Sequence, residues 1–230
     1  MSRLKWDQDN ERLYETGVKN GVLFVKGSSG YGAGVAWNGL TAVTESPSGA
    51  EATALYADDL KYLNLYSNEE LGGTIEAYTY PEEFMACDGS ASLIEGLNIG
   101  QQGRSEFAFC YKTTVGNDSQ GNDYGYKLHI IYGCKASPSE RAYATINDSP
   151  EAITFSWEFT TTPVSFKVNG KDYTTCNITI DSTKFTEESA KTKLKALEDY
   201  IYGTDSGSSS GTESALPMPE KVYELLHGAA

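Results

Sequence analysis

The side chains best suited to acid–base chemistry are two histidines, the only ones in the chain. His129 lies in the alternating run KLHIIYG, on the opposite face from Leu128 and Ile130. We therefore expect a solvated or interface position for its ring. His227 lies in the C-terminal tail, and neither histidine has a Ser or Cys beside it in a recognisable nucleophile motif. The sequence predicts no Ser-His-Asp or Cys-His catalytic site.

The four cysteines are too widely spaced to form a redox or metal-binding motif. No CxxC spacing occurs, and the first residues, MSRLKWDQDNERLYE, do not have the apolar core of a signal peptide. We therefore expect reduced thiols in strands and in a short helix, at Cys87, Cys110, Cys134 and Cys176.

Glycine-rich and acidic stretches also lack the spacing that chemistry requires. Gly27–Gly34, GSSGYGAG, lacks the Lys-Ser/Thr end of a phosphate-binding loop and precedes a predicted hairpin instead of a helix. Gly116–Asp123 lacks the ligand spacing of a calcium loop and favours an exposed hairpin tip. Adjacent acids are expected to face water or a helix N-terminus, at Asp58-Asp59, Glu69-Glu70, Glu82-Glu83 and Glu187-Glu188. The sequence predicts a protein that is not an enzyme and needs no cofactor or metal ion.

Charge and hydropathy limit the classes of partner that we expect for this chain. Lys and Arg total 18 against 32 Asp and Glu, which gives a net charge of -14. Such a surface repels nucleic acid and gains nothing from anionic membrane headgroups. The chain has no run of 18 apolar residues, so we expect a soluble protein without a membrane anchor, made in the cytoplasm.

Strand signals dominate the first part of the chain. Asn38-Gly39 stands between Val35–Trp37 and Leu40–Thr44, a pattern that predicts a β-hairpin. Asp59–Tyr66 and Gly73–Tyr80 are expected to form a second strand pair. Between these pairs, the segment 44–58 is rich in Ser, Gly, Ala, Pro and Thr and has almost nothing to bury. We expect a long loop there, held on a firm hairpin and available to contact another surface.

The second part of the chain alternates more regularly. One-face strands are predicted around Phe107–Tyr111, Tyr126–Tyr132, Ile153–Thr160 and Cys176–Ile180. Two segments are helical instead. Pro81–Cys87, with Gly89 beyond it, favours one or two helical turns. A longer helix begins at an N-cap Thr186 and ends at Gly203, and its stripe should cover one face of the sheet, through Ala190, Leu194, Leu197 and Ile201.

Both ends of the chain are predicted to extend from one β domain, residues 1–202. Residues 1–16 read as an N-terminal arm, 203–215 as a flexible linker and 216–230 as a C-terminal arm that orders only against a neighbour. The fold class is mainly β: a sandwich or barrel with one packed helix, an extended inter-strand loop and flexible terminal arms.

Long strings of this sequence resemble the major tail proteins, or tail tube proteins, of long-tailed phages and prophages of Gram-positive bacteria. The likeness covers nearly the whole chain and differs in linker length and at the extreme C-terminus. The strings that carry it are GVAWNGLTAVTESPSGAEATALYADDLKYLNLYSNEELGGTIEAYTYPEEFMACDG (34–89), GLNIGQQ (96–102), GNDSQGNDYGYKLHIIYGCKASPSERAYATINDSPEAITFSWEFTTTPV (116–164), LEDYIYG (197–203) and LPMPEKVYELL (216–226).

The resemblance implies a structural virion protein in the phage tail. Six copies would close into a ring, and rings would stack into a tube through which DNA passes without specific binding. It implies further contacts with the tape measure, tail terminator and distal tail proteins. It also implies a loop that reaches the adjacent ring, for which the candidates here are Thr44, Glu45, Ser46, Pro47, Ser48, Gly49, Glu51, Thr53, Leu55, Tyr56 and Asp58. Terminal arms contribute to stacking in that family, with candidates Leu216, Met218, Val222, Tyr223 and Leu225 in the C-terminal arm.

Two other functions remain open at the sequence level. Aromatic richness also suits a carbohydrate- or surface-binding β-sandwich, because sugar rings stack on exposed Trp and Tyr. Trp37 and Trp157 lie at strand positions that read as core, which leaves Trp6 free to bind. The tube protein of a contractile injection device would share the fold but carry no DNA. Under the tail tube hypothesis, Asp and Glu facing the lumen would keep DNA sliding by denying it contacts with cations.

Overall fold

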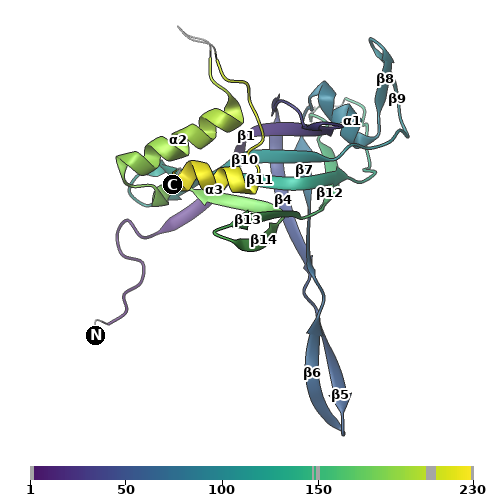
Figure 1. Cartoon of the computed structure of the whole chain (residues 1–230). Coiled ribbons are helices and arrows are strands. Elements are labelled where there is room, and N and C mark those ends of the chain that lie inside the picture. The colour runs from purple at the N-terminus through teal and green to yellow at the C-terminus, as the bar shows by residue number, and fades with distance from the viewer. Residues whose placement is uncertain (1–2, 147, 149–150, 206–210, 229–230) are drawn as a thin grey trace.

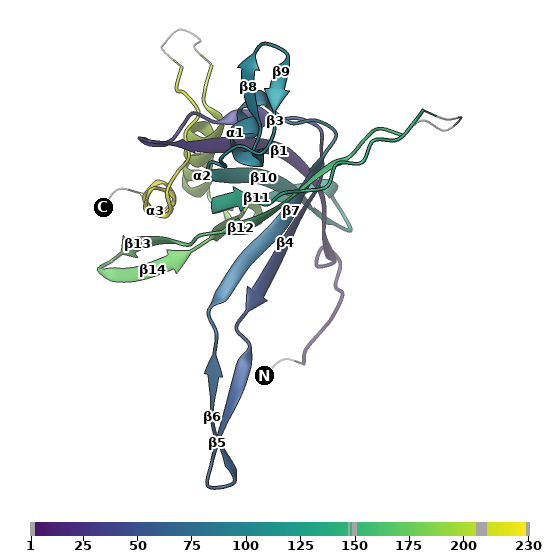
Figure 2. The same ribbon diagram turned by 90° about the vertical axis from the view of Figure 1, so that its right-hand side faces the viewer.

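The computed structural model describes residues 3–146, 148, 151–205 and 211–228, and this part of the chain is mainly β, as predicted. Within it, one antiparallel sheet follows the order β2-β1-β10-β11-β12-β7-β4, with β3 on β1 and β15 on β11. Figures 1 and 2 show the sheet from two directions. Its strands are β1 (Leu13–Gly27), β2 (Gly30–Tyr31), β3 (Val35–Trp37), β4 (Leu40–Gly49), β7 (Glu69–Ala77), β10 (Phe107–Asn117), β11 (Gly121–Ala136), β12 (Phe155–Thr161) and β15 (Asn177–Asp181).

Smaller hairpins and helices surround this sheet. The hairpins, each a separate two-stranded sheet, are β5 (Ala52–Ala57) with β6 (Leu60–Tyr66), β8 (Ala91–Ile94) with β9 (Leu97–Ile99), and β13 (Val164–Val168) with β14 (Lys171–Thr175). The helices are α1 (Met85–Asp88), which follows a 3-10 turn at Glu82–Phe84, α2 (Glu188–Tyr202) and α3 (Pro219–His227). The predicted helical turns before Gly89 are confirmed by α1 and its 3-10 turn.

The large sheet curves around a first apolar core. Side chains from β1, β10 and β11 meet side chains from β7 and β12 in one cluster, so the two ends of the sheet face each other. Trp37 lies at its centre, with ring centroids 4.6 Å from Phe84, 5.4 Å from Phe109 and 5.5 Å from Trp157. Tilted and edge-on aromatic contacts of this kind hold the two layers in one arrangement.

A second core lies on the other face of β1, β10 and β11, beneath α2 and α3. Because both faces of β10 are covered, its side chains from Phe107 to Tyr111 are all buried, whichever way they point. The predicted apolar stripe of α2 is confirmed, since Leu194, Leu197 and Ile201 are buried there. The predicted cap is wrong: the N-cap is Glu187, and its side chain makes no capping hydrogen bond.

The Asn38-Gly39 dipeptide does not make a hairpin. Residues 35–37 pair with β1, through Gly21 opposite Trp37, and β4 pairs with β7, through Val43 opposite Ile75. The dipeptide links the two halves of the curved sheet. The reason is the buried Trp37 ring, whose indole N–H donates to the carbonyl of Thr79 at 2.9 Å and anchors β3 in the core.

The expected loop at 44–58 is also wrong, and so is the expected pairing of 59–66 with 73–80. Strand β4 continues to Gly49, and β5 then pairs with β6 from Ala52 opposite Tyr66 to Ala57 opposite Leu60. Strand β7 pairs instead with β4 and β12. Small residues that cannot build a core still form a backbone ladder, so this segment is a long hairpin rather than a loop.

Other strand predictions hold with small shifts. The hairpin tip at 116–123 is confirmed, because Asn117 pairs with Gly121 at the turn between β10 and β11. Strand β12 buries Trp157 and Phe159 and exposes Glu158 and Thr160, which is the one-face pattern expected. The cysteines lie as expected, with Cys87 in α1, Cys110 in β10, Cys134 in β11 and Cys176 just before β15.

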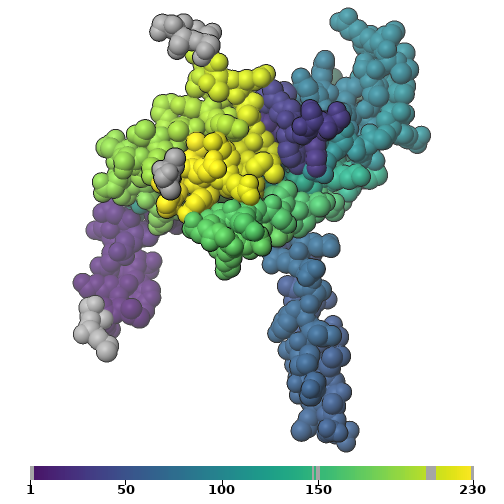
Figure 3. Space-filling view, viewed as in Figure 1, coloured from purple at the N-terminus to yellow at the C-terminus, as the bar shows by residue number. Residues whose placement is uncertain are grey.

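The two ends of the chain are more ordered than expected. The N-terminal arm is shorter, because residues 13–16 belong to β1 and pair with β10, Leu13 standing opposite Asn117. Within the linker, 206–210 lie outside the described residues, and Thr204 and Thr212 are joined by a backbone hydrogen bond of 2.9 Å. The prediction that the C-terminal segment orders only against a neighbour is wrong, because α3 packs beside α2 on its own subunit (Figure 3).

Candidate assembly interface

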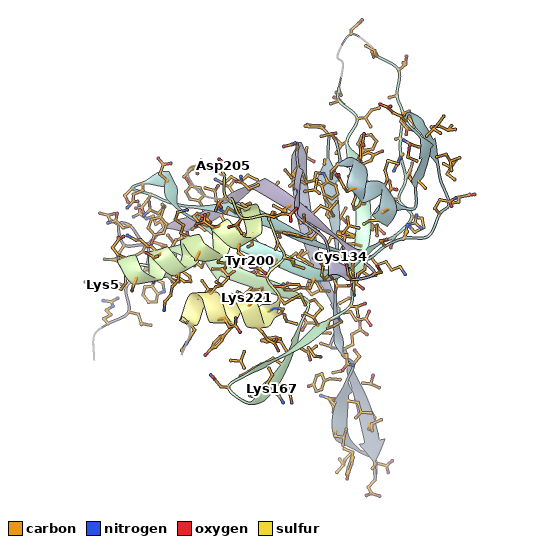
Figure 4. The ribbon with its side chains drawn as sticks, turned by 45° about the horizontal axis from the view of Figure 1, so that its top comes forward. Lys5, Cys134, Lys167, Tyr200, Asp205 and Lys221 are labelled. Atoms are coloured by element: carbon orange, nitrogen blue, oxygen red, sulfur yellow. The ribbon has the colours of Figure 1, made fainter. Side chains whose placement is uncertain are left out.

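The β5–β6 hairpin stands clear of the rest of the molecule. Figures 1 and 3 show it leaving the body as a narrow rod, and we call Ala52–Tyr66 the projecting hairpin. A strand rises about 3.3 Å per residue, so the six residues of β5 alone add roughly 20 Å of reach. Its side chains stand out on both faces (Figure 4). Exposed large apolar residues crowd this short stretch, at Leu55, Tyr56, Leu60, Tyr62, Leu63, Leu65 and Tyr66.

Most of the predicted contact residues lie along the hairpin or the strand that leads to it. Thr53, Leu55, Tyr56 and Asp58 are exposed within it. Six further predicted contact residues are exposed along the end of β4 and the residues that lead into the hairpin: Thr44, Ser46, Pro47, Ser48, Gly49 and Glu51. Glu45 is the exception, because its carboxylate turns inward and accepts hydrogen bonds from the Tyr111 hydroxyl (2.8 Å) and the Asn177 amide (3.1 Å).

The strand predicted at Asp59–Tyr66 is confirmed as β6, but it pairs with β5 and not with the strand predicted at 73–80. Leu60 and Tyr62 each leave 72% of their surface exposed, so DLKYLNLY does not pack in the body of the domain. The signal available in the sequence was its density of apolar residues, which do not alternate cleanly with polar ones. A strand with one buried face would alternate.

A joint separates the projecting hairpin from the β4–β7 ladder. Gly49 and Ala50 both adopt positive φ, +82° and +52°. Across the joint, the Ala50 amide donates to the Asn68 carbonyl (3.4 Å) and the Ser67 amide to the Glu51 carbonyl (3.3 Å). A Cβ on Gly49 would lie 2.2 Å from the Asn68 carbonyl oxygen, so the joint requires glycine at this position. The direction of the hairpin is therefore set by local backbone geometry.

The tip of the hairpin is acidic and conformationally unusual. Asp58 and Asp59 connect β5 to β6, and both have positive φ, +49° and +60°. Two positive values are those of a type I′ turn, for which Asn-Gly is preferred because left-handed backbone costs little there. This chain places two carboxylates at the tip in spite of that cost.

The opposite end of the molecule carries a polar groove beside α1. It has a volume of about 530 Å³ and is lined by residues that include Asp88, Gln101, Gln102, Arg104, Ser139 and Arg141. The Arg141 guanidinium pairs with the buried Asp88 carboxylate, and Arg104 Nη2 donates to the Asp88 carbonyl at 2.9 Å. Gly89, with φ +85°, lets the Arg104 guanidinium approach, since a Cβ would lie 2.9 Å from it. We call this the arginine groove.

Among the described residues, β2, β3, β4 and β15 each have a ladder partner on one side only, and β4 and β15 are the longest of these strands. Strand β4 pairs with β7 on one side, and β15 pairs with β11 on one side. Unpaired edges invite another strand, which monomeric proteins usually prevent. Pro47 lies in β4, and an edge strand is the place in a sheet where a missing N–H is tolerated. The two edges belong to different strands, so they are not copies of one surface.

The terminal segments differ in how far they are committed to their own subunit. Leu216 and Val222 are buried in the second core, and the Tyr132 hydroxyl donates to the Pro217 carbonyl at 2.8 Å. Tyr223 and Leu225 are half-buried, and Met218 is exposed. Of the five predicted contact residues in this arm, Met218 is therefore the most accessible to a neighbour. At the N-terminus, Trp6 leaves 70% of its surface exposed.

His129 lies in a polar cluster on the large sheet. Its ring stacks on Tyr111 with centroids 4.6 Å apart, and its nitrogens lie 3.0 Å from Thr113 Oγ1 and 3.3 Å from Thr179 Oγ1. The ring does lie on the face opposite Leu128 and Ile130, but it is mostly covered, so the solvated alternative is wrong and the interface alternative stays a prediction.

Two carboxylates flank this ring and shape its titration. Glu15 Oε1 lies 3.7 Å from His129 Nε2, and Glu45 Oε1 lies 3.9 Å from Nδ1. Burial lowers the pKa of His129 and outweighs both carboxylates, which act to raise it. Burial would raise the pKa of Glu15, but hydrogen bonds from Lys127 and Thr113 hold it below its usual value. The cluster therefore holds a neutral histidine beside the charged Glu15 carboxylate at neutral pH.

The thiols and the possible metal ligands are dispersed. All four cysteines are free, and Cys134 lies at the centre of the fold (Figure 4). Burial raises the pKa of Cys87 to about 12, and the pKa of Cys134 lies well above its usual value for the same reason. Within the described ranges, no His, Cys, Asp and Glu side chains gather as a metal site would require. None of the helices described is long and apolar enough to cross a bilayer.

Comparisons with models of known protein families and with curated proteins gave no match to this chain. The case for a function therefore depends on the geometry above and on the sequence resemblance.

Proposed function

We propose that this chain is the tail tube protein of a long-tailed phage or prophage. Six copies close into a ring, and rings stack into the tube through which DNA leaves the virion. The protein acts as a structural part and not as an enzyme. The observation that carries this proposal is the projecting hairpin, whose exposed apolar side chains have no surface of their own subunit to cover them.

The energetics of the hairpin favour a second copy. An isolated two-stranded hairpin is marginally stable in water, and contiguous exposed apolar side chains mark interaction sites. Burying apolar surface contributes about 25 cal/mol for each Å² removed from water. Covering Tyr62, Leu65 and Tyr66 against an adjacent subunit would therefore stabilise both the hairpin and the assembly.

The unpaired edges of β4 and β15 are candidates for the contact between neighbouring subunits that closes a ring. A head-to-tail ring needs two different surfaces on each subunit, and β4 and β15 offer one edge each. Strand pairing between neighbours would join the sheets of the ring into one continuous wall, as the resemblance implies. Stacking of rings is open-ended, so the tape measure, tail terminator and distal tail proteins are the partners that set length and close the ends.

The acidic composition fits a conduit for DNA. With a net charge of -14, the chain offers few free cations to the phosphate backbone. Non-specific binding to DNA depends on Lys and Arg contacts that release counterions. An acidic lumen would therefore let DNA slide without being held.

The carbohydrate-binding alternative loses its best side chains in the structure. Trp37 and Trp157 are each 3% exposed, so neither indole can stack on a sugar ring. Trp6 is the tryptophan that remains accessible, beside exposed tyrosines such as Tyr56 and Tyr62. The tube protein of a contractile injection device would have the same surfaces, and the neighbouring genes separate it from a phage tail. A tape-measure gene downstream and head-completion genes upstream indicate a phage.

Negative-stain electron microscopy of the purified chain tests the proposal. We expect rings about six subunits in circumference, and stacked tubes as the protein concentration rises, because stacking is a bimolecular step. A glycan array run on the same preparation tests the carbohydrate-binding alternative. Stable monomers at every concentration, with binding to defined glycans, would show that the chain is a recognition module instead.

A further inference from the structure

We propose that the acidic tip of the projecting hairpin docks in the arginine groove of a second copy of this chain. This inference rests on the proposed function, because it names the surface of the next ring that receives the hairpin. It joins two features that the fold of one subunit does not explain: two left-handed aspartates, and two arginines beside one carboxylate that pairs with only one of them.

The first feature is the choice of residues at the tip. A residue other than glycine in left-handed backbone costs of order 1 kcal/mol, and both central positions of this turn are occupied by aspartate. Asp58 and Asp59 are exposed, and no hydrogen bond or ion pair within the described chain uses either carboxylate. The strain and the charge are therefore unexplained within one subunit and point to a cationic partner.

The second feature is the surplus of positive charge in the arginine groove. Arg141 pairs with the Asp88 carboxylate, whereas Arg104 donates to the Asp88 backbone carbonyl and forms no ion pair among the described residues, so one positive charge is left over in a chain of net charge -14. Arg104 Nε is buried, and none of the described residues accepts a hydrogen bond from it. A guanidinium offers five N–H donors in a planar fork that suits carboxylate oxygens. A carboxylate in the groove would give these donors an acceptor.

Several lysines of the body are each matched by one carboxylate. Lys26 faces Glu106, Lys112 faces Glu198 and Lys127 faces Glu15, each cation with its own carboxylate. On α2, Lys195 pairs with Asp199 one turn away. The arginine groove instead brings two guanidiniums beside a single acidic lining residue, Asp88.

The placement of the two features suits end-to-end contact. In Figure 1 the projecting hairpin points down and α1 lies at the top on the same side, and Figure 2, turned by 90°, keeps this order. A copy shifted along the hairpin axis therefore brings the tip of one subunit to the α1 end of the next. Each copy then donates a tip and offers a groove, so the contact is heterologous and propagates without limit.

A charge-removing variant tests the contact without harming the turn. Asp58→Asn with Asp59→Gly installs the preferred type I′ sequence, so the thermal midpoint of the single subunit should not fall. The protein concentration needed for tubes should rise by roughly tenfold or more. Glu69→Gln with Glu70→Gln removes two exposed acids at the base of the same arm and serves as the matched control, which should leave that concentration unchanged.

Salt gives a second readout of the same variant. At about 1 M salt the Debye length falls to about 3 Å, and attraction between tip and groove is screened. The gap between the original chain and the Asn-Gly variant should therefore close as salt is added. Equal tube formation by the two proteins at low salt would overturn the inference.

Cysteine cross-linking locates the contact directly. Leu60→Cys beside the tip and Gln102→Cys in the groove leave both aspartates and both arginines in place. Under mild oxidation the double variant should give a ladder of covalent dimers, trimers and longer species, and neither single variant should. Tubes that form without a ladder would overturn this docking site and leave the tail tube proposal standing. Absence of tubes from the unsubstituted chain would instead overturn the tail tube proposal.

Discussion

At the residue scale, the polar cluster around His129 is a balance of burial and charge. The ring is stacked on Tyr111 and lies within 4 Å of two carboxylate oxygens, yet its pKa is lowered because burial outweighs them. Tyr111 is tied into the same cluster, since burial and its bond to Glu45 raise its pKa. Lys127 balances Glu15 on the exposed side. The contribution of the cluster to the free energy of unfolding therefore depends on pH.

The pH dependence of folding has a definite sign here. The folded pKa of His129 lies below its usual value of 6.5, so the unfolded chain takes up the proton first as the pH falls. Stability should be complete above that value and fall as the pH drops through it toward the folded pKa. The lowered pKa of Glu15 extends the loss below its usual value of 4.5.

Replacing the imidazole of His129 measures its contribution to the pH dependence of stability. In His129→Asn, the drop in thermal midpoint between about pH 7.5 and about pH 5.5 should be smaller than in the original chain, because one titrating group is gone. His227→Asn, at the exposed end of α3, is the matched control and should keep the original pH profile. The measurement is thermal unfolding across a pH series. Identical profiles for the two variants would show that His129 does not carry the effect.

Residue-level prediction from sequence was limited by long-range contacts. The parity of His129 could be predicted from the alternation of β11, because a strand places neighbours on opposite faces. Its neighbours could not, since Glu15, Glu45 and Thr179 come from three strands that are far away in the sequence. Glu45 stands in a stretch rich in Ser and Gly, and nothing local indicates that it turns inward.

At the element scale, the strands that cover a core were predictable and their partners were not. Alternation located β10, β11 and β12 because each buries at least one face. The hairpin predicted at Asn38-Gly39 does not form, because a buried tryptophan and a long partner strand outweigh the local turn preference. The pairing of β5 with β6 in the projecting hairpin was not predicted, because the hairpin has no core and a hydrophobic pattern reports only on cores.

The C-terminal segment offers a direct test of its commitment to its own subunit. Leu216 is 8% exposed in the second core, and Met218, two residues on, is 39% exposed. Leu216→Ala should lower the free energy of unfolding by about 2 to 3 kcal/mol, through lost burial and a residual cavity. Met218→Ala, in the same segment, should change it by less than about 0.5 kcal/mol.

Urea unfolding of the dilute, unassembled protein measures both variants. An equal and negligible effect would mean that the C-terminal segment is not packed on its own subunit in solution. It would restore the expectation of a free arm that orders against a neighbour.

At the scale of the whole molecule, the chain is a body with two unlike ends. The projecting hairpin extends from one end, and the arginine groove with β8 and β9 lies at the other (Figure 2). Unlike ends produce polar, open-ended assemblies, whereas two identical patches would close into a dimer. Acidity over the remaining surface keeps copies apart until specific contacts form. Such a molecule is suited to polymerisation in one direction.

The most direct test of the central claim removes the hairpin and keeps the body. The Glu51 carbonyl and the Ser67 amide are 3.3 Å apart, so replacing 52–66 by Gly-Gly closes the ladder with a two-residue turn. The shortened chain should unfold at nearly the same temperature as the original, because neither apolar core includes the hairpin. In electron micrographs we expect rings or single subunits in place of tubes. Tubes as long and as abundant as those of the full chain would contradict the account.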